Sequence, residues 1–184
     1  MTGSGSVLYL VRHGRPAIDR LQPAHEWQLD PAYVEDVRAL RHRLPEHADW
    51  FSSPEPKAIG TARLLTDEPV EVVPELREHE RRTTDWIEDF EPVVRRAFDR
   101  PDLSAYDGWE PLAHTRTRVV SAVAGILDQH PGRDVVLVGH GTAWTLLRSA
   151  LSGEPPDPDW WARLAMPDVV HYPAPHDLGD MLDT

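Results

Sequence analysis

Two histidines follow apolar runs that are typical of β-strands. The segments VLYLVRHG (7–14) and DVVLVGHG (134–141) end in His13 and His140, and Arg12 precedes the first of these histidines. An imidazole can act near neutral pH as an acid, a base or a nucleophile, and an arginine binds anions through its planar fork of donors. Taken alone, either histidine is equally compatible with a structural role at a strand end.

The surrounding pattern predicts which elements position these side chains. Strand-like runs alternate with segments of helical spacing: strands are expected at 7–11, 50–53, 70–73 and 134–138, and helices at 31–44, 54–65, 87–98, 111–130 and 141–152, with a last strand near 169–172. This alternation is typical of a parallel sheet with helices on both faces. Ligands of such sheets bind at the carboxyl ends of the strands, so we expect His13 and His140 to meet in one crevice.

Length and composition limit the function classes. The 184 residues fit one domain, 1–184, with a core of about 7–152 and a segment 153–184 that is rich in proline and aspartate. The absence of cysteine excludes disulfides and thiolate metal sites. A net charge of −12 disfavours nucleic acid as a partner, although a local cationic pocket can still bind a small anion. No apolar run approaches a membrane span and the start lacks a signal-peptide pattern, so a soluble cytoplasmic protein without a membrane partner is expected. The oligomeric state stays open.

Five segments together resemble the histidine phosphatase superfamily, also called phosphoglycerate mutase-like. They are RHG (12–14), SSPEPKAIGTA (52–62), LRE (76–78), GWE (108–110) with the later pair RV (118–119), and VGHG (138–141), and they occur in the order typical of that family. Each match is weak to moderate alone, but together they span residues 7 to about 150. The resemblance implies a three-layer αβα sandwich around a mostly parallel sheet.

The resemblance also implies a two-step phosphoryl transfer. His13 would attack phosphorus and form a phosphohistidine. His140 would donate hydrogen bonds to the phosphoryl oxygens, and Glu78 would protonate the leaving group and then activate water. Glu75, Glu80 and Asp85 are alternative acids in the same charge-rich stretch.

Phosphate binding would fall to Arg12, to Lys57, and to the backbone of Gly141 and Thr142 at the start of the following helix. The chemistry implied by the family needs no metal or other cofactor.

The chain departs from the family pattern at three places. Lys57 stands where the family usually has arginine, which gives up bidentate geometry. Arg81 and Arg82 could compensate for this change, and Arg15 is a further candidate for the substrate pocket. The stretch RPAID (15–19) lacks the serine or threonine and the asparagine that the mutases tend to have.

These features favour a phosphomonoesterase of the histidine acid phosphatase type that acts on a small phosphorylated metabolite. The alternatives are a mutase, a protein-phosphohistidine phosphatase, and a phosphate-binding relative without turnover, the last suggested by Lys57. A serine hydrolase is disfavoured because Gly141 occupies the position of the nucleophile in a Gly-x-Ser-x-Gly elbow. No His-Glu-x-x-His or Gly-x-x-x-x-Gly-Lys stretch exists, which disfavours a zinc hydrolase and excludes a P-loop kinase.

Other prominent residues have structural roles as their simplest interpretation. His79, His114 and His171 are expected to be incidental, although His79 or His171 could reach the pocket. The tryptophans are expected to pack rather than to recognise substrate: Trp86, Trp109, Trp160 and Trp161.

Overall fold

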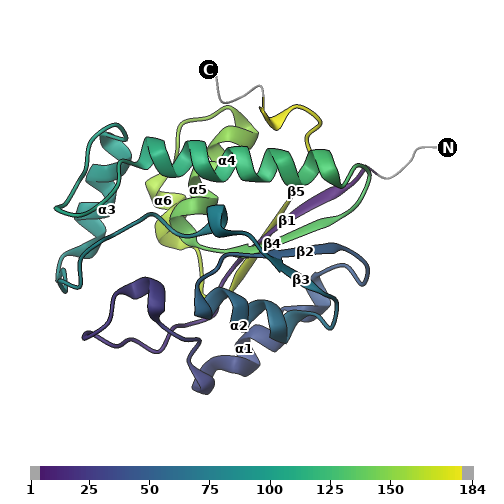
Figure 1. Cartoon of the computed structure of the whole chain (residues 1–184), viewed down its shortest axis with the longest axis horizontal. Helices are drawn as coiled ribbons and strands as arrows, with labels where there is room; N and C mark the ends of the chain where they lie inside the picture. Colours follow the sequence, from purple (N-terminus) through teal and green to yellow (C-terminus); the bar gives the residue numbers. More distant parts are fainter. Residues whose placement is uncertain (1–4, 180–184) are drawn as a thin grey trace.

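The computed structural model describes residues 5–179 and shows a five-stranded sheet between two layers of helices (Figure 1). The predicted domain 1–184 and its segment 153–184 extend beyond this range, and residues 1–4 and 180–184 lie outside the described residues. The three-layer αβα architecture expected from the sequence is confirmed.

Four parallel strands and one antiparallel strand form the sheet in the order β3-β2-β4-β1-β5. Their bounds are Val7–Arg12 (β1), Asp49–Ser52 (β2), Val70–Val72 (β3), Val135–Gly139 (β4) and Asp168–Pro173 (β5). Every residue of β4 is buried because helices cover both faces, which explains its unbroken apolar sequence. The antiparallel β5 pairs with β1 at the sheet edge.

The register of β1 and β4 places the two histidines side by side. Arg12 pairs with Gly139, and the amide of His13 donates to the Gly139 carbonyl at 2.9 Å. Trp144, one helical turn after His140, donates through its indole Nε1 to the Val11 carbonyl at 2.8 Å. The strands that carry His13 and His140 are therefore fastened to each other at their carboxyl ends.

One face of the sheet is covered by α1 (Val34–Arg38) and α2 (Pro56–Leu65). The helix expected over 31–44 is broken: 3-10 turns at Pro31–Tyr33 and Arg41–Arg43 flank the short α1. Asp30 caps the first of these turns as predicted, accepting from the Ala32 amide. Only Val37 of α1 is buried, so this layer contributes little apolar area beyond α2.

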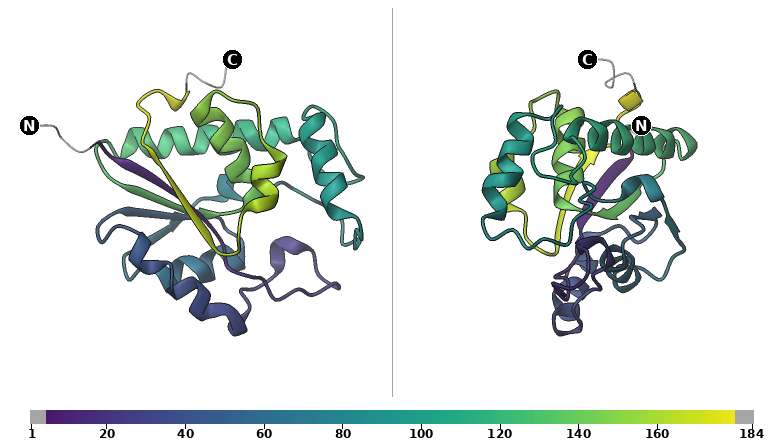
Figure 2. Two further views of the ribbon diagram at one scale, coloured as in Figure 1. Left: turned by 180° about the vertical axis from the view of Figure 1, so that it is seen from behind. Right: turned by 60° about the vertical axis from the view of Figure 1, so that its left-hand side comes forward.

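The other face carries α3 (Phe90–Asp99), α4 (Leu112–Gln129), α5 (Gly141–Ser152) and α6 (Pro158–Arg163). Figure 2 shows from two further sides that α4 and α5 lie across the sheet from α1 and α2. The sequence did not predict α6, which begins after the Asp157 cap within the proline-rich tail. Two short 3-10 turns, Ala24–Glu26 and Pro74–Leu76, complete the described elements.

Two long connections extend from the end of the sheet where the parallel strands terminate. These are the segment 13–30 and the segment 77–111 that contains α3 (Figure 1). They touch where the guanidinium of Arg20 lies 3.9 Å from the ring centroid of Trp86. Within residues 5–179, no helix is long and apolar enough to cross a membrane.

Candidate active site

His13 and His140 form the centre of the site at the carboxyl ends of β1 and β4. Their ring centroids are 5.1 Å apart with the planes at 65°, and both side chains are buried. The sequence predicted this meeting from the two strand-end positions.

The surroundings of His13 fix its tautomer and its charge. Its Nδ1 lies 2.7 Å from the carbonyl oxygen of Gly14, which only accepts, so Nδ1 carries the proton and Nε2 has a free lone pair. Burial, followed by the neighbouring His140 and Lys57, holds the pKa of His13 well below its ordinary 6.5. His13 is thus a neutral imidazole with Nε2 as the nucleophilic atom.

Gly14 is required by a close approach of backbone to core. A Cβ at this position would lie 2.5 Å from Val37 Cγ2 and 2.7 Å from Leu29 Cδ1. The Gly14 amide donates to Thr61 Oγ1 at 2.9 Å. These contacts lock the turn whose carbonyl orients His13.

His140 is held through its Nε2, whereas His13 is held through its Nδ1. Its Nε2 lies 2.7 Å from Ser53 Oγ, and Ser53 Oγ also accepts from the Glu55 amide at 3.3 Å. Ser53 Oγ has a second lone pair and can also accept from Nε2–H, whereas Nδ1 of His140 is buried without a partner in residues 5–179. Burial is the largest influence on the pKa of His140 and lowers it, which keeps the ring neutral.

Two arginines lie beside the histidines. Arg12 donates from Nη1 to the Leu164 carbonyl at 2.5 Å, and its Nε is buried without a partner in the described part of the chain. Arg81 lies over Phe90 at 4.8 Å and over Trp109 at 4.6 Å, and its Nε is likewise unpaired. The lack of a side chain at Gly141 leaves room for the Arg12 guanidinium, because a Cβ there would lie only 3.2 Å from Arg12 Cζ.

The unpaired donors indicate an anion site. Within residues 5–179, the buried side-chain polar atoms without a partner include Arg12 Nε, Arg81 Nε and His140 Nδ1. Buried donors are normally satisfied, and a tetrahedral oxyanion presents the acceptors that these donors lack. The group is therefore suited to binding phosphate.

Glu78 lies at the amino end of α5. Its carboxylate accepts from the amides of Thr142 and Ala143 at 3.1 Å each and from the His79 amide at 2.9 Å. Burial raises the pKa of Glu78, but His140, Arg81 and the backbone donors outweigh it and lower the pKa to about 2. The Thr142 amide, expected to bind phosphate, thus donates to Glu78.

The alternative acids lie elsewhere. Glu80 forms surface ion pairs with Arg77 at 2.7 Å and Arg82 at 3.1 Å, while Glu75 and Asp85 are exposed. Only Glu78 of this stretch is brought to the histidines.

Arg118 of α4 positions the segment that carries Glu78. Its guanidinium donates to the carbonyls of Glu75, Arg77 and Glu78 at 2.7, 2.9 and 3.3 Å, and to the carboxylate of Glu110 at 2.6 Å. Four acceptors on one partly buried guanidinium fix the backbone path of 75–78.

Lys57 is buried, but its ammonium is largely occupied. Nζ donates to Glu55 Oε2 at 2.5 Å and to the Ala24 carbonyl at 2.6 Å. The lysine thereby ties the segment 13–30 to α2. One donor remains for a bound anion.

Sequence reasoning did not single out Glu55, which is 6 % exposed. Its Oε1 accepts from the Glu78 amide at 2.9 Å and lies 3.5 Å from His140 Nε2. The sequence feature that could have identified Glu55 is its place two residues before Lys57, between Pro54 and Pro56, in the second matched segment.

The remaining pocket candidates have partners other than the two histidines. Arg15 is exposed and lies over the ring of Tyr33 at 4.5 Å, and Arg82 is exposed beside Glu80. His79 is buried and bonded through Nε2 to the Glu110 carbonyl at 2.6 Å, a structural arrangement.

The other aromatic residues mostly have structural contacts. His171 packs on Tyr9 at the far sheet edge, and His114 is exposed. Trp109, Trp160 and Trp161 pack in apolar clusters, whereas Trp86 is 44 % exposed.

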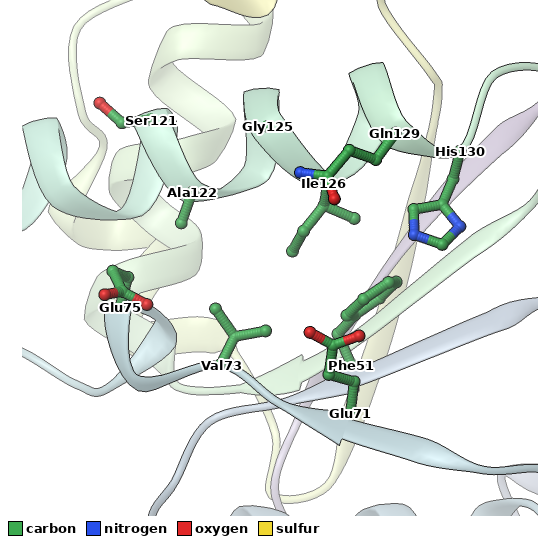
Figure 3. Close-up of a pocket in the computed structure, with 10 residues that line it drawn as sticks. All are labelled: Phe51, Glu71, Val73, Glu75, Ser121, Ala122, Gly125, Ile126, Gln129 and His130. Carbon is green, nitrogen blue, oxygen red and sulfur yellow. The ribbon is translucent and has the colours of Figure 1, made fainter.

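A cavity of about 290 Å³ lies away from the histidines, between α4 and the β2–β3 side of the sheet (Figure 3). Its polar groups come from Glu71, Glu75, Ser121, Gln129 and His130, of which Glu75 was considered as an alternative acid. Among residues 5–179, no cluster of three or more histidine or acidic side chains is arranged to hold a metal ion.

Comparisons with known proteins show the same fold. YhfR of Bacillus stearothermophilus matches with a TM-score of 0.74 and 26 % identity over 90 % of each chain. The mycobacterial glucosyl-3-phosphoglycerate phosphatase matches with a TM-score of 0.72 and 22 % identity over 91 % of this chain and 89 % of its own. A phosphoserine phosphatase mutant from Entamoeba histolytica, solved with phosphoserine, matches with a TM-score of 0.71 and 16 % identity over 90 % and 89 %. At these last two identities the likeness shows the fold alone.

No match was found among curated proteins. The model of the histidine phosphatase superfamily (branch 1) matches residues 8–172, which is most of the sequence. The chain therefore belongs to the histidine phosphatase superfamily.

Proposed function

We propose that this protein hydrolyses phosphate monoesters through a phosphohistidine formed on His13. The observation that carries the proposal is the neutral His13, whose Nδ1–H donates to Gly14 and whose Nε2 lone pair lies beside unpaired donors. Nε2 forms a bond to phosphorus as the bond from phosphorus to the ester oxygen breaks, and this splits one displacement into two.

The donors around His13 would stabilise the transferring group. Arg12 Nε, Arg81 Nε and His140 Nδ1–H are positioned to bind the phosphoryl oxygens, where negative charge must be stabilised during transfer. Because these groups are fixed before substrate arrives, little reorganisation accompanies the reaction.

Glu78 would transfer the protons. In the free site it is a carboxylate with a pKa of about 2, but a bound phosphate beside it disfavours its negative charge and raises that pKa. The protonated carboxyl gives its proton to the leaving alkoxide. In the second step the carboxylate takes a proton from water, which attacks phosphorus as the bond to His13 Nε2 breaks.

We further propose a small phosphorylated metabolite as the substrate. Phosphoserine is named with one structural neighbour and glucosyl-3-phosphoglycerate with another, and both are small phosphate monoesters. A mutase is less well supported, because RPAID (15–19) lacks the polar residues that shape a sugar-acid site and Arg15 lies on Tyr33.

A phosphate-binding protein without turnover is the second candidate. The observation in its favour is that Lys57, at the usual arginine position, donates to Glu55 and Ala24. It predicts that phosphate or vanadate binds and that no monoester is hydrolysed.

The test is hydrolysis of p-nitrophenyl phosphate with EDTA present, from pH 5 to pH 8. We expect turnover in the wild type and in the exposed control His114→Ala, and loss of turnover in His13→Ala. Wild type denatured at alkaline pH during turnover should carry a phosphoryl group on His13 by mass spectrometry, and mild acid should remove that group. Turnover that persists in His13→Ala would refute the mechanism, and phosphate binding without turnover in the wild type would favour the second candidate.

A further inference from the structure

Glu55 is a buried carboxylate that the mechanism above does not use. It precedes α2 at the cap position, but its side chain makes no capping bond to that helix and extends into the site. A carboxylate is rarely this buried without partners, so its contacts indicate what it does.

The two carboxylate oxygens of Glu55 have different partners. Oε2 pairs with Lys57 Nζ at 2.5 Å. Oε1 accepts from the Glu78 amide at 2.9 Å and lies 3.5 Å from His140 Nε2. Glu55 therefore connects the lysine, the segment of the proposed acid, and the back of the second histidine.

The position of Glu55 behind His140 is the informative contact. In the free site Nε2 faces Ser53 Oγ, which can donate or accept, and Nδ1 is buried without a partner among the described residues. When both nitrogens carry protons, Nε2–H has two acceptors within reach, Ser53 Oγ at 2.7 Å and Glu55 Oε1 at 3.5 Å. A ring that donates from Nδ1 to a phosphoryl oxygen and from Nε2 to these acceptors carries both protons, so the site can hold a protonated His140 at both nitrogens.

The charges that face His140 decide when it takes up that proton. Glu55 and Glu78 favour the charged ring, Lys57 and Arg12 oppose it, and the neutral His13 adds an edge-on ring contact. A phosphoryl dianion at the Nδ1 side adds negative charge and an acceptor, both of which favour the protonated ring.

We propose that Glu55 is a positioning residue that allows His140 to carry a proton while a phosphoryl group is bound. The inference rests on the proposed function only in requiring that a phosphoryl group binds at His140 Nδ1. Protonated His140 would offer a charge-assisted hydrogen bond to the transferring group. Glu55 also neutralises the charge of Lys57, and the positive charge on His140 replaces the charge that is neutralised there.

The experiment observes His140 directly. Protein labelled with ¹⁵N-histidine is titrated with inorganic phosphate, and the Nδ1 and Nε2 signals of His140 are followed from pH 5 to pH 9. In the phosphate-bound wild type we expect both nitrogens to show imidazolium shifts at pH 7. In Glu55→Gln, which keeps the shape and removes the charge, we expect the bound ring to be neutral at pH 7.

Matched variants separate this role from a general loss of structure. Lys57→Met removes an opposing cation, so bound His140 should hold its proton to higher pH. The double variant Glu55→Gln/Lys57→Met removes both charges of the buried pair, so bound His140 should lose its proton at a pH between those of the two single variants. Circular dichroism verifies that each variant is folded.

Activity gives a second readout. With p-nitrophenyl phosphate, the alkaline limb of kcat should lie at lower pH in Glu55→Gln than in the wild type, because the bound histidine loses its proton earlier. A purely structural role would lower kcat without moving the limb.

The proposal is overturned when phosphate leaves His140 neutral in the wild type, when it changes no His140 signal, or when Glu55→Gln titrates like the wild type. Persistent turnover in His13→Ala is a separate result: it refutes the phosphohistidine mechanism and leaves the NMR outcome to judge Glu55.

Discussion

Replacing Glu78 by glutamine removes a carboxylate whose pKa is about 2 in the folded protein, against an ordinary value of 4.5. A lowered carboxylate pKa stabilises the folded state above the ordinary value, and this stabilisation is lost as the pH falls toward the folded value. The gap between 4.5 and about 2 corresponds to about 3 kcal/mol at pH 7, of which about 2 kcal/mol is lost by pH 3. Glu78→Gln lacks this carboxylate, so its unfolding free energy does not include this loss at low pH.

The assay is urea unfolding of the wild type and Glu78→Gln at pH 7, 5, 4 and 3. The difference in unfolding free energy between the two proteins should shrink by about 2 kcal/mol from pH 7 to pH 3. Glu75→Gln, an exposed acid of the same stretch, is the control and should follow the wild type. A difference that stays constant over this range would refute the reasoning that His140, Arg81 and the α5 amides hold Glu78 ionised.

Three further outcomes follow from contacts in the site. Lys57→Met leaves the charge of Glu55 buried without its ion-pair partner and should lower the free energy of unfolding by about 3–5 kcal/mol in urea. The double variant Lys57→Met/Glu55→Leu should recover most of this loss. A single variant as stable as the wild type would contradict the burial of the pair. Gly14→Ala places a Cβ 2.5 Å from Val37 Cγ2 and should lower the free energy of unfolding by about 1–3 kcal/mol. In a double-mutant cycle, Val37→Ala should reduce this loss. Additive effects of the two substitutions would argue against the clash. Arg118→Met releases the carbonyls that hold the segment of the proposed acid and should lower kcat for p-nitrophenyl phosphate about 100-fold. Phosphate affinity measured by calorimetry should change little, and a matching loss of affinity would contradict a role limited to positioning.

The centre of the sheet was predictable because its strands are short apolar runs that helices cover on both faces. β1 and β4 stand out in this way, and their ends place His13 and His140. The α6 helix was not predictable, because six residues in a proline-rich tail give too short a periodic signal. The break after Arg38 was missed because apolar spacing continues through 34–44 although the backbone changes to 3-10 turns.

The meeting of the site residues was predictable only in part. Both histidines, Arg12 and Glu78 belong to matched segments, and the fold brings them together. Glu55 was missed because its contacts come from positions 23 and 85 residues away, at Glu78 and His140. A local pattern cannot distinguish such a carboxylate from an ordinary helix cap.

The fastening of β1 to β4, through the His13 amide and the Trp144 indole, has a consequence for how this enzyme framework could be altered. The spacing of the two histidines is set within the sheet, whereas the segments 13–30 and 77–111 touch through the exposed pair Arg20 and Trp86. Sequence exchange limited to 15–30 and 83–107, which leaves His13, Gly14, Glu78 and Arg81 unchanged, keeps the bonds between the strand ends in place. The framework therefore permits loop grafting between relatives, in which the range of accepted compounds changes while the reacting atoms stay in register.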